Sequence, residues 1–206
     1  MITLLRGAAI LKRSSVGHRS KSTHAALPYA ELPAFMQRLR ATDGMPARAV
    51  EFMILTGVRL SEARNAAWDE IDDNVWTIPA ERMKGNKEHR VPLPPPVCDL
   101  LESLPRVGGI VFGGASRNAL LAAVKAINPD VTAHGFRSTF RTWIAERTSY
   151  PEAVAEQALA HAVSGAVLKA YRRTDLFDRR RRLMAEWARY CYSPVVASGQ
   201  VVALHG

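Results

Sequence analysis

The chain has little cysteine and no long hydrophobic run. Only two of its 206 residues are cysteines, Cys98 and Cys191, and they form no CxxC pair and lie near no histidine cluster. A disulfide framework and a zinc site are therefore not indicated. No apolar run approaches the roughly 18 to 20 residues that a membrane-spanning helix needs. These absences predict a globular protein of a reducing cytoplasm, with no metal and no membrane partner.

Positive charge is what the chain has in excess. The formal net charge is +9 and the sequence pI is about 10.1. Such a balance favours a polyanionic partner, with nucleic acid ahead of an anionic membrane surface. The opening segment MITLLRGAAILKR does not resemble a signal peptide, because Arg6 interrupts its apolar run and no small-residue cleavage site follows.

Composition divides the chain into three parts. Residues 1–26 are expected to be an N-terminal remnant and basic linker, because residues 12–26 are basic, rich in serine and poor in large apolar side chains. Residues 193–206 lack periodicity, and we expect this tail to be disordered or to dock on a partner. Between them, residues 27–192 carry enough apolar side chains for one folded domain.

Hydrophobic periodicity predicts a mainly α fold with a small antiparallel β-sheet (α+β). Two β-prone runs, 75–78 and 89–93, flank a polar stretch and predict a hairpin with two lysines at its tip. A short helix is expected from Ser61 as N-cap, without a capping box because Arg64 stands three positions on. Further helices are expected at 29–40, 46–56, 97–104, 116–127, 134–147, 151–159, 164–171 and 175–191.

The segment HGFR holds two residues suited to binding a phosphate. His134 and Arg137 are three positions apart and share one helix face. Arginine stays charged and offers a planar fork that matches phosphate oxygens. For this pair alone, a solvated surface histidine and arginine remain the more common explanation.

Two segments in the first half supply further cations. Arg59 follows the apolar helix 46–56 and Gly57, so its charged head is delivered beside the core, and Glu62 can pair with it. A surface salt bridge is the plain alternative. At the hairpin tip, Lys84 could act as a general acid toward a leaving oxygen. Lys87 competes with it, and composition does not choose between them.

Tyr171 could attack phosphorus through its phenolic oxygen and form a covalent intermediate. Val167 and Leu168 precede it at helical spacing, so a buried core tyrosine is the alternative. His161 could equally be a structural residue at a helix end. The run 179–182 has the composition of a phosphate-contacting patch, but its position in an amphipathic helix also fits a solvated basic face.

In this order, TGVRLSEAR, KGNKEHRVPL, HGFR, LAH and Tyr171 resemble the tyrosine recombinases of the phage-integrase superfamily, most closely prophage-type integrases of bacteria. The resemblance runs from about Leu27 to Cys191. It implies the fold of a tyrosine recombinase catalytic domain, which breaks and rejoins DNA without a cofactor. It also implies a bacterial, nucleoid-associated protein.

The resemblance implies a role for each matching residue. Arg59 and Arg137 would clamp the scissile phosphate, His134 and His161 would assist, and Lys84 would be the general acid. Glu62 would brace the site and Tyr171 would be the nucleophile. We also expect DNA contacts from four further cations, which are Lys87, Arg141, Arg172 and Arg173.

One departure from the family concerns the N-terminal side. Family integrases normally carry a helical domain there that closes around DNA, whereas only some two dozen residues precede Leu27. We expect a site-specific recombinase that acts on double-stranded DNA as a homo-tetramer. The alternatives are a noncatalytic DNA-binding remnant and a type IB topoisomerase-like relaxing enzyme.

Overall fold

The computed structural model describes residues 25–161 and 176–195. The expected helix 164–171, with Tyr171, and the neighbouring Arg172 and Arg173 lie outside the described residues, as does most of the expected tail. Within the described ranges, no helix is long and apolar enough to cross a membrane. The architecture is mainly α-helical with one small antiparallel sheet, as the periodicity predicts.

The first three helices lead to the Arg59 segment. Helix α1 spans Leu32–Arg40, α2 spans Met45–Thr56 and α3 spans Leu60–Arg64. Gly57 ends α2 in the left-handed conformation, with φ of 68°, which a glycine adopts without steric cost. The N-cap of α3 is Arg59 and not Ser61, because the Arg59 amide donates to the Glu62 carboxylate at 2.7 Å. The expectation of a Ser61 cap was therefore wrong, and Glu62 at the third helical position supplies the capping contact.

The sheet is the predicted hairpin extended by one short strand. Strands β1 (Ile71–Asp72), β2 (Val75–Ile78) and β3 (His89–Pro92) lie in the order β1-β2-β3, and both pairings are antiparallel. Ile78 pairs with His89, so Lys84 and Lys87 lie in the loop between the two strands, where both are exposed. The two-residue β1 is too short to show alternation in a sequence.

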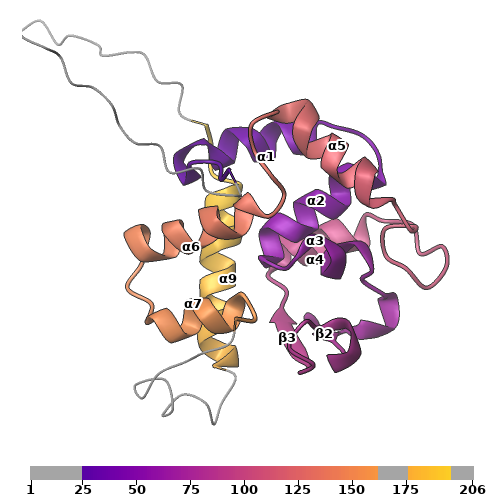
Figure 1. Ribbon diagram of the computed structural model, residues 1–206. Coiled ribbons are helices and arrows are strands. Elements are labelled where there is room, and N and C mark those ends of the chain that lie inside the picture. The colour runs from indigo at the N-terminus through magenta and orange to yellow at the C-terminus, as the bar shows by residue number, and fades with distance from the viewer. Residues whose placement is uncertain (1–24, 162–175, 196–206) are drawn as a thin grey trace, which may run out of the picture.

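The remaining described α-helices follow the expected ranges within a few residues. They are α4 (Pro95–Glu102), α5 (Arg117–Ile127), α6 (Gly135–Arg147), α7 (Glu152–Ala158) and α9 (Phe177–Cys191). Ser116 caps α5 by accepting a hydrogen bond from the Ala119 amide. Helices α6, α7 and α9 lie together on one side of the molecule, and α2 to α5 with the sheet form the other (Figure 1).

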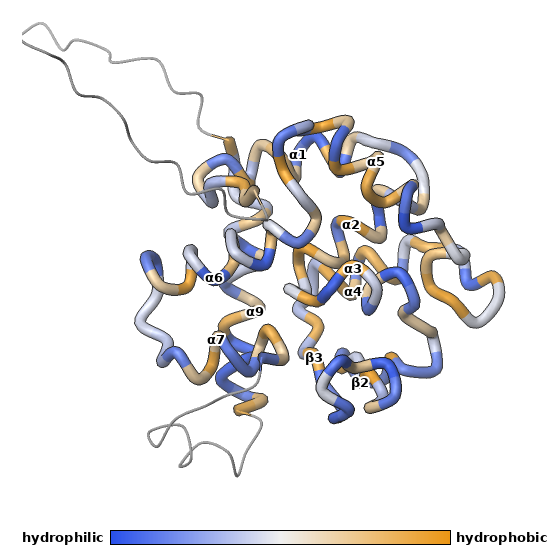
Figure 2. Tube along the Cα trace, viewed as in Figure 1, coloured by the Kyte–Doolittle hydropathy of each residue, from blue (hydrophilic) through white to orange (hydrophobic). Residues whose placement is uncertain are grey.

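Helices α2 and α9 join these two sides. Helix α2 is buried over most of its length, and Figure 2 shows hydrophobic residues along it and hydrophilic ones in the β2–β3 loop. The Trp187 indole of α9 donates to the Ile54 carbonyl of α2 at 2.8 Å, and the Trp187 ring packs on Phe140 of α6. The core is therefore continuous beneath the segments that carry Arg59 and Arg137.

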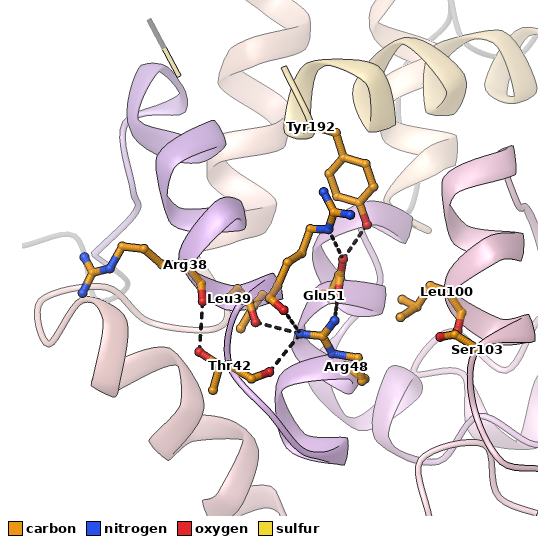
Figure 3. A network of polar contacts seen from close by, with 9 residues as sticks. Arg38, Leu39, Thr42, Arg48, Glu51, Leu100, Ser103 and Tyr192 are labelled. Atoms are coloured by element: carbon orange, nitrogen blue, oxygen red, sulfur yellow. Dashed lines mark hydrogen bonds and ion pairs between the residues drawn. The ribbon is translucent and has the colours of Figure 1, made fainter. Parts of the chain in front are cut away.

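A buried acid ties the end of α9 to α2. Glu51 is 1% exposed, and its carboxylate pairs with Arg48 at 2.9 Å and accepts the Tyr192 hydroxyl at 2.5 Å (Figure 3). Arg48 also donates to the Leu39 carbonyl at the end of α1. Because the partners come from three helices, this network fixes how the chain leaves α9.

The run 179–182 is divided by burial. Arg180 is 1% exposed and donates to the Arg90 carbonyl of β3 at 2.5 Å, whereas Arg179, Arg181 and Arg182 are exposed. The interpretation of a uniformly solvated basic face was wrong for Arg180, because its guanidinium joins α9 to the sheet.

Candidate active site

A basic cleft opens where α3, α5 and the start of α6 meet. It encloses about 600 Å³. Its floor is apolar and includes Leu121, Val124 and Val131, while Arg59, His134 and Arg137 line it together. Arg64, Arg117 and Lys125 add further positive charge to the lining. The structure therefore brings three of the predicted site residues into one cavity of the described chain, although Arg59 and Arg137 are far apart in sequence.

Arg137 is held by backbone carbonyls from two helix ends. Its side chain donates to the Gly57 carbonyl at 2.6 Å and to the Leu159 carbonyl at 2.5 Å, and its Nη2 lies 3.0 Å from Nε2 of His161. A guanidinium has five N–H donors, so these contacts leave two, one on Nη1 and the one on Nε. The buried Nε has no hydrogen-bond partner among the described residues. An anion in the cleft could accept these remaining hydrogens.

Arg59 is held by the carboxylate of Glu62, whereas backbone carbonyls hold Arg137. Its Nη1 lies 2.8 Å from the Glu62 carboxylate, whose other oxygen accepts the Arg59 amide. Glu62 is 4% exposed, while the Arg59 side chain is 25% exposed. The Glu62 carboxylate therefore contacts both the guanidinium and the amide of Arg59, as a bracing residue would, and part of the guanidinium still faces the cleft.

His161 is oriented by an acid that sequence reasoning did not single out. Its Nδ1 lies 2.8 Å from the Glu156 carboxylate, so Nδ1 carries a proton and donates it. The opposite nitrogen, Nε2, then accepts from Arg137. Glu156 also pairs with Arg141 at 2.8 Å. His161 lies five positions after Glu156 and beyond the end of α7, so helix periodicity does not predict this contact.

The expected DNA contact of Arg141 stays a prediction. Its guanidinium pairs with both Glu152 and Glu156, at 2.6 and 2.8 Å. Its side chain is 37% exposed, so a DNA phosphate would have to compete with two carboxylates for it.

The positively charged side chains of Arg59 and Arg137 lie close together in the cleft. Burial and, to a smaller extent, the positive charge of Arg59 lower the pKa of Arg137 to about 10, while Glu62 and Glu156 oppose the shift. Arg137 therefore remains a cation at neutral pH. Two cations held close by the fold store electrostatic repulsion, which a bound anion would relieve.

The hairpin places Lys84 and Lys87 on an exposed loop. Both side chains are exposed, and neither lines the basic cleft. The base of the loop is nevertheless fixed, since Arg82 pairs with Glu70 and donates to the Glu62 carbonyl at 2.9 Å. Arg82 thus links the hairpin to the acid that orients Arg59, a nonlocal contact with no signal in the sequence.

His89 was not among the predicted site residues, yet it lies beside them. It is 9% exposed, and burial lowers its pKa to about 3, with the charges of Arg180, Arg137 and Arg59 contributing. A hydrogen bond to the backbone of Ala158 opposes this shift. His89, the first residue of β3, is therefore neutral and contacts the backbone of Ala158. The carbonyl of the next residue, Leu159, accepts a hydrogen bond from Arg137.

The four tyrosines of the described residues are engaged in structural contacts. Tyr150 donates to Glu186 at 2.7 Å, Tyr190 to the Tyr29 carbonyl at 2.9 Å, and Tyr192 to Glu51. A hydrogen bond with Glu146 raises the pKa of Tyr29. None of these four tyrosines lines the cleft. The chain contains five tyrosines, and the fifth is Tyr171, which lies outside the described residues.

The arrangement is suited to binding a phosphate and stabilising negative charge on it. Two guanidiniums from different helices face one cavity, and His134 stands at the N-cap of α6 beside them. Hydrogen-bond donors that are fixed in advance where charge develops usually contribute most to such catalysis. Among the residues that the structure describes, no group of three or more His, Cys, Asp or Glu side chains could hold a metal ion.

Comparison with known proteins finds relatives over most of the chain. The sequence profile of the phage integrase family matches residues 26–176. The chain is 36% identical over 191 residues to prophage integrase IntA of Escherichia coli K12, which covers 85% of this chain and 46% of the relative. It is 34% identical over 203 residues to the integrase of enterobacteria phage P4, with 83% and 46% covered. The chain thus spans about half the length of these relatives.

Solved structures share the fold. A lambda integrase(75-356) dimer bound to a COC′ core site superposes with a TM-score of 0.53 at 17% identity, covering 70% of this chain and 60% of that one. The XerH site-specific recombinase bound to its difH substrate gives 0.53 at 17% identity, covering 67% and 47%. On the strength of the family match to residues 26–176, the chain belongs to the phage integrase family.

Proposed function

We propose that this chain is the catalytic part of a site-specific tyrosine recombinase, which cleaves and rejoins double-stranded DNA for integration or excision of a mobile element. The observation that carries the proposal is the pairing of Arg59 and Arg137 in one cleft. They reach it from the start of α3 and from α6, which are far apart in sequence, at an electrostatic cost that an anion would offset. The names of the relatives support the same activity.

In the proposed reaction, the phenolic oxygen of Tyr171 attacks the scissile phosphorus. A 3′-phosphotyrosyl bond forms, the bond to the 5′ oxygen breaks, and Lys84 donates a proton to that oxygen. Arg59 and Arg137 stabilise the charge on the non-bridging oxygens, and His134 and His161 assist proton transfer by taking up the phenolic proton that Tyr171 loses as it attacks. Rejoining is the reverse attack by a 5′ hydroxyl, which conserves the energy of the phosphodiester.

Tyr171 is proposed as the nucleophile on two grounds. Position 171 falls within the match to the phage integrase family. The other four tyrosines make structural contacts, and none of them lines the cleft.

The proposed organisation has a catalytic domain at residues 27–192, preceded by a linker and followed by a short tail. The partner is double-stranded DNA, with Lys87, Arg141, Arg172 and Arg173 as further phosphate contacts and a homo-tetramer on recombining sites. A lambda integrase dimer and the XerH recombinase, which share the fold, were solved on DNA. Light scattering with and without DNA would test the assembly, and a monomer under both conditions would contradict it.

Covalent trapping tests the proposed function. The chain would be incubated with a library of nicked duplexes with randomised core sequence, in which the cleaved fragment diffuses away and the adduct accumulates. We expect adducts that resist denaturing detergent. Salt-dependent DNA binding without any adduct would contradict the proposal and favour a noncatalytic binder, whereas relaxation of supercoiled plasmid without strand exchange would favour a topoisomerase.

A further inference from the structure

Residues 25–27, which we name the strap, cross the start of α6. The Ala25 carbonyl accepts the Thr132 amide at 3.0 Å and the Thr132 hydroxyl at 3.3 Å. The Leu27 carbonyl accepts the Thr139 hydroxyl at 2.6 Å, and the Leu27 side chain is 3% exposed in the core. The strap is therefore bound on both sides of the turn that carries His134.

Gly135 is the point of closest approach. A methyl group built on it would lie 2.2 Å from the Ala25 carbonyl oxygen and 2.9 Å from the Ala26 Cα. Both are backbone atoms, and hydrogen bonds hold the first of them in place. Gly135 begins α6 and has no positive φ, so its backbone conformation does not require glycine. The requirement comes from space, because only glycine lets the strap backbone lie against the helix start.

The same helix turn carries the cleft residues. His134 is the N-cap of α6, and Arg137 lies two residues beyond Gly135. The Gly135 amide donates to the Thr132 hydroxyl at 3.0 Å, and that hydroxyl in turn reaches the strap. A displaced strap would therefore shift the α6 start relative to α2 and α7, whose carbonyls hold Arg137.

We propose that the strap is a positioning element of the cleft and that Gly135 and Thr139 are positioning residues, which set His134 and Arg137 for cleavage by fixing the start of α6. This inference rests on the proposed function. It assigns residues that lie outside the phosphate contacts, and it links the cleavage step to the path of the chain that enters the domain. A misplacement of about 1 Å is enough to cost on the order of 10² in rate.

The first test is Gly135→Ala in the full chain, with Gly109→Ala as matched control. A methyl group on Gly109 meets nothing within 4 Å. Single-turnover cleavage of one duplex taken from the trapping library would be measured at saturating DNA, well below the melting temperature of each variant. We expect Gly135→Ala to lose on the order of 10² in cleavage rate with unchanged affinity for the intact duplex, and Gly109→Ala to match the wild type.

A second pair of variants covers the case in which Gly135→Ala does not fold. Thr139→Val removes the hydroxyl that binds the Leu27 carbonyl and keeps the side-chain shape, whereas Thr139→Ser keeps the hydroxyl. We expect the valine variant to cleave more slowly at saturating DNA and the serine variant to recover the wild-type rate.

The outcomes separate this inference from the proposed function. If the wild type forms no adduct, the proposed function and the inference both fail. A wild type that cleaves, together with Thr139→Val and a folded Gly135→Ala that cleave equally fast, would overturn the inference alone. Variants with lower melting temperatures but full cleavage rates would make the strap purely structural and would also overturn it.

Discussion

The two ends of the proposed catalytic apparatus are built in different ways. At one end, Arg137 is 6% exposed, and carbonyls of α2 and α7 hold it within the core. At the other end, Lys84 is exposed on a loop, and Arg82 at the base of that loop is held by Glu70 and the Glu62 carbonyl. In the proposed reaction, the fold would therefore set phosphate binding by Arg137 in advance, whereas proton transfer from Lys84 to the leaving oxygen would depend on the position of the exposed loop when DNA is bound.

Removal of the buried arginine should have the largest effect. We expect Arg137→Lys to reduce the single-turnover cleavage rate on the order of 10² to 10³, because an ammonium cannot hold two carbonyls and a phosphate in one plane. Arg38→Ala is the matched control, since it also changes an arginine but on the exposed face of α1. Equal rates for Arg137→Lys and Arg38→Ala would remove Arg137 from the site.

Substitution of Lys84 and of Lys87 should have different effects on the cleavage rate. Lys84→Ala should lose on the order of 10² in rate, at the lower end for general acids because the loop is exposed. A substrate with sulfur in place of the bridging 5′ oxygen should restore most of the rate, since a thiolate leaves without a proton. Lys87→Ala should lose less and show no such rescue. Rescue of Lys87→Ala instead of Lys84→Ala would exchange the two assignments.

The brace of Arg59 is expected to matter for stability as well as for rate. Glu62→Gln keeps an oxygen acceptor but removes the charge beneath Arg59, so the free energy of unfolding should fall by roughly 1.5 to 3 kcal/mol. Urea unfolding would measure it. Glu152→Gln is a suitable comparison, because the Glu152 side chain is 69% exposed in its own pair with Arg141 and should change stability little. Equal losses would show that burial of Glu62 is irrelevant.

A further expected effect concerns the pH dependence of stability. His89 has a pKa of about 3 in the folded protein, below the roughly 6.5 of an unfolded histidine, so the unfolded chain binds the extra proton. Stability from this residue is therefore fully present above pH 6.5 and is lost as pH falls toward 3, by at most about 1.4 kcal/mol per pH unit. His89→Asn should flatten the dependence between pH 6.5 and 5, measured by urea midpoints. An unchanged slope would contradict the assignment.

The sequence patterns predicted the elements that are long and periodic. Helix α2, the hairpin strands and the helix of Arg137 stand within a few residues of their expected places, and Arg59 and Arg137 share a cleft as the family resemblance implied. The helix ends beside the cleft could be predicted from short segments, since Gly57 in TGVR ends α2 and His134 in HGFR caps α6.

The contacts between segments far apart in the chain could not be predicted from the sequence. Glu156 and Arg82 take their roles from partners on other elements, and His89 owes its neutral state to burial against α7 and α9. The close approach of Ala25 to Gly135 joins residues more than a hundred positions apart. No local periodicity encodes such pairings, because they depend on how helices are packed after each has formed.

The whole proposed reaction depends on a covalent bond between Tyr171 and DNA. Protease digestion of the trapped wild-type adduct, followed by mass spectrometry, would locate the phosphotyrosyl peptide among the five tyrosines. We expect a nucleotide on Tyr171 alone and no adduct from Tyr171→Phe. An adduct that persists in Tyr171→Phe, or a nucleotide on Tyr29, Tyr150, Tyr190 or Tyr192, would contradict the assignment of the nucleophile.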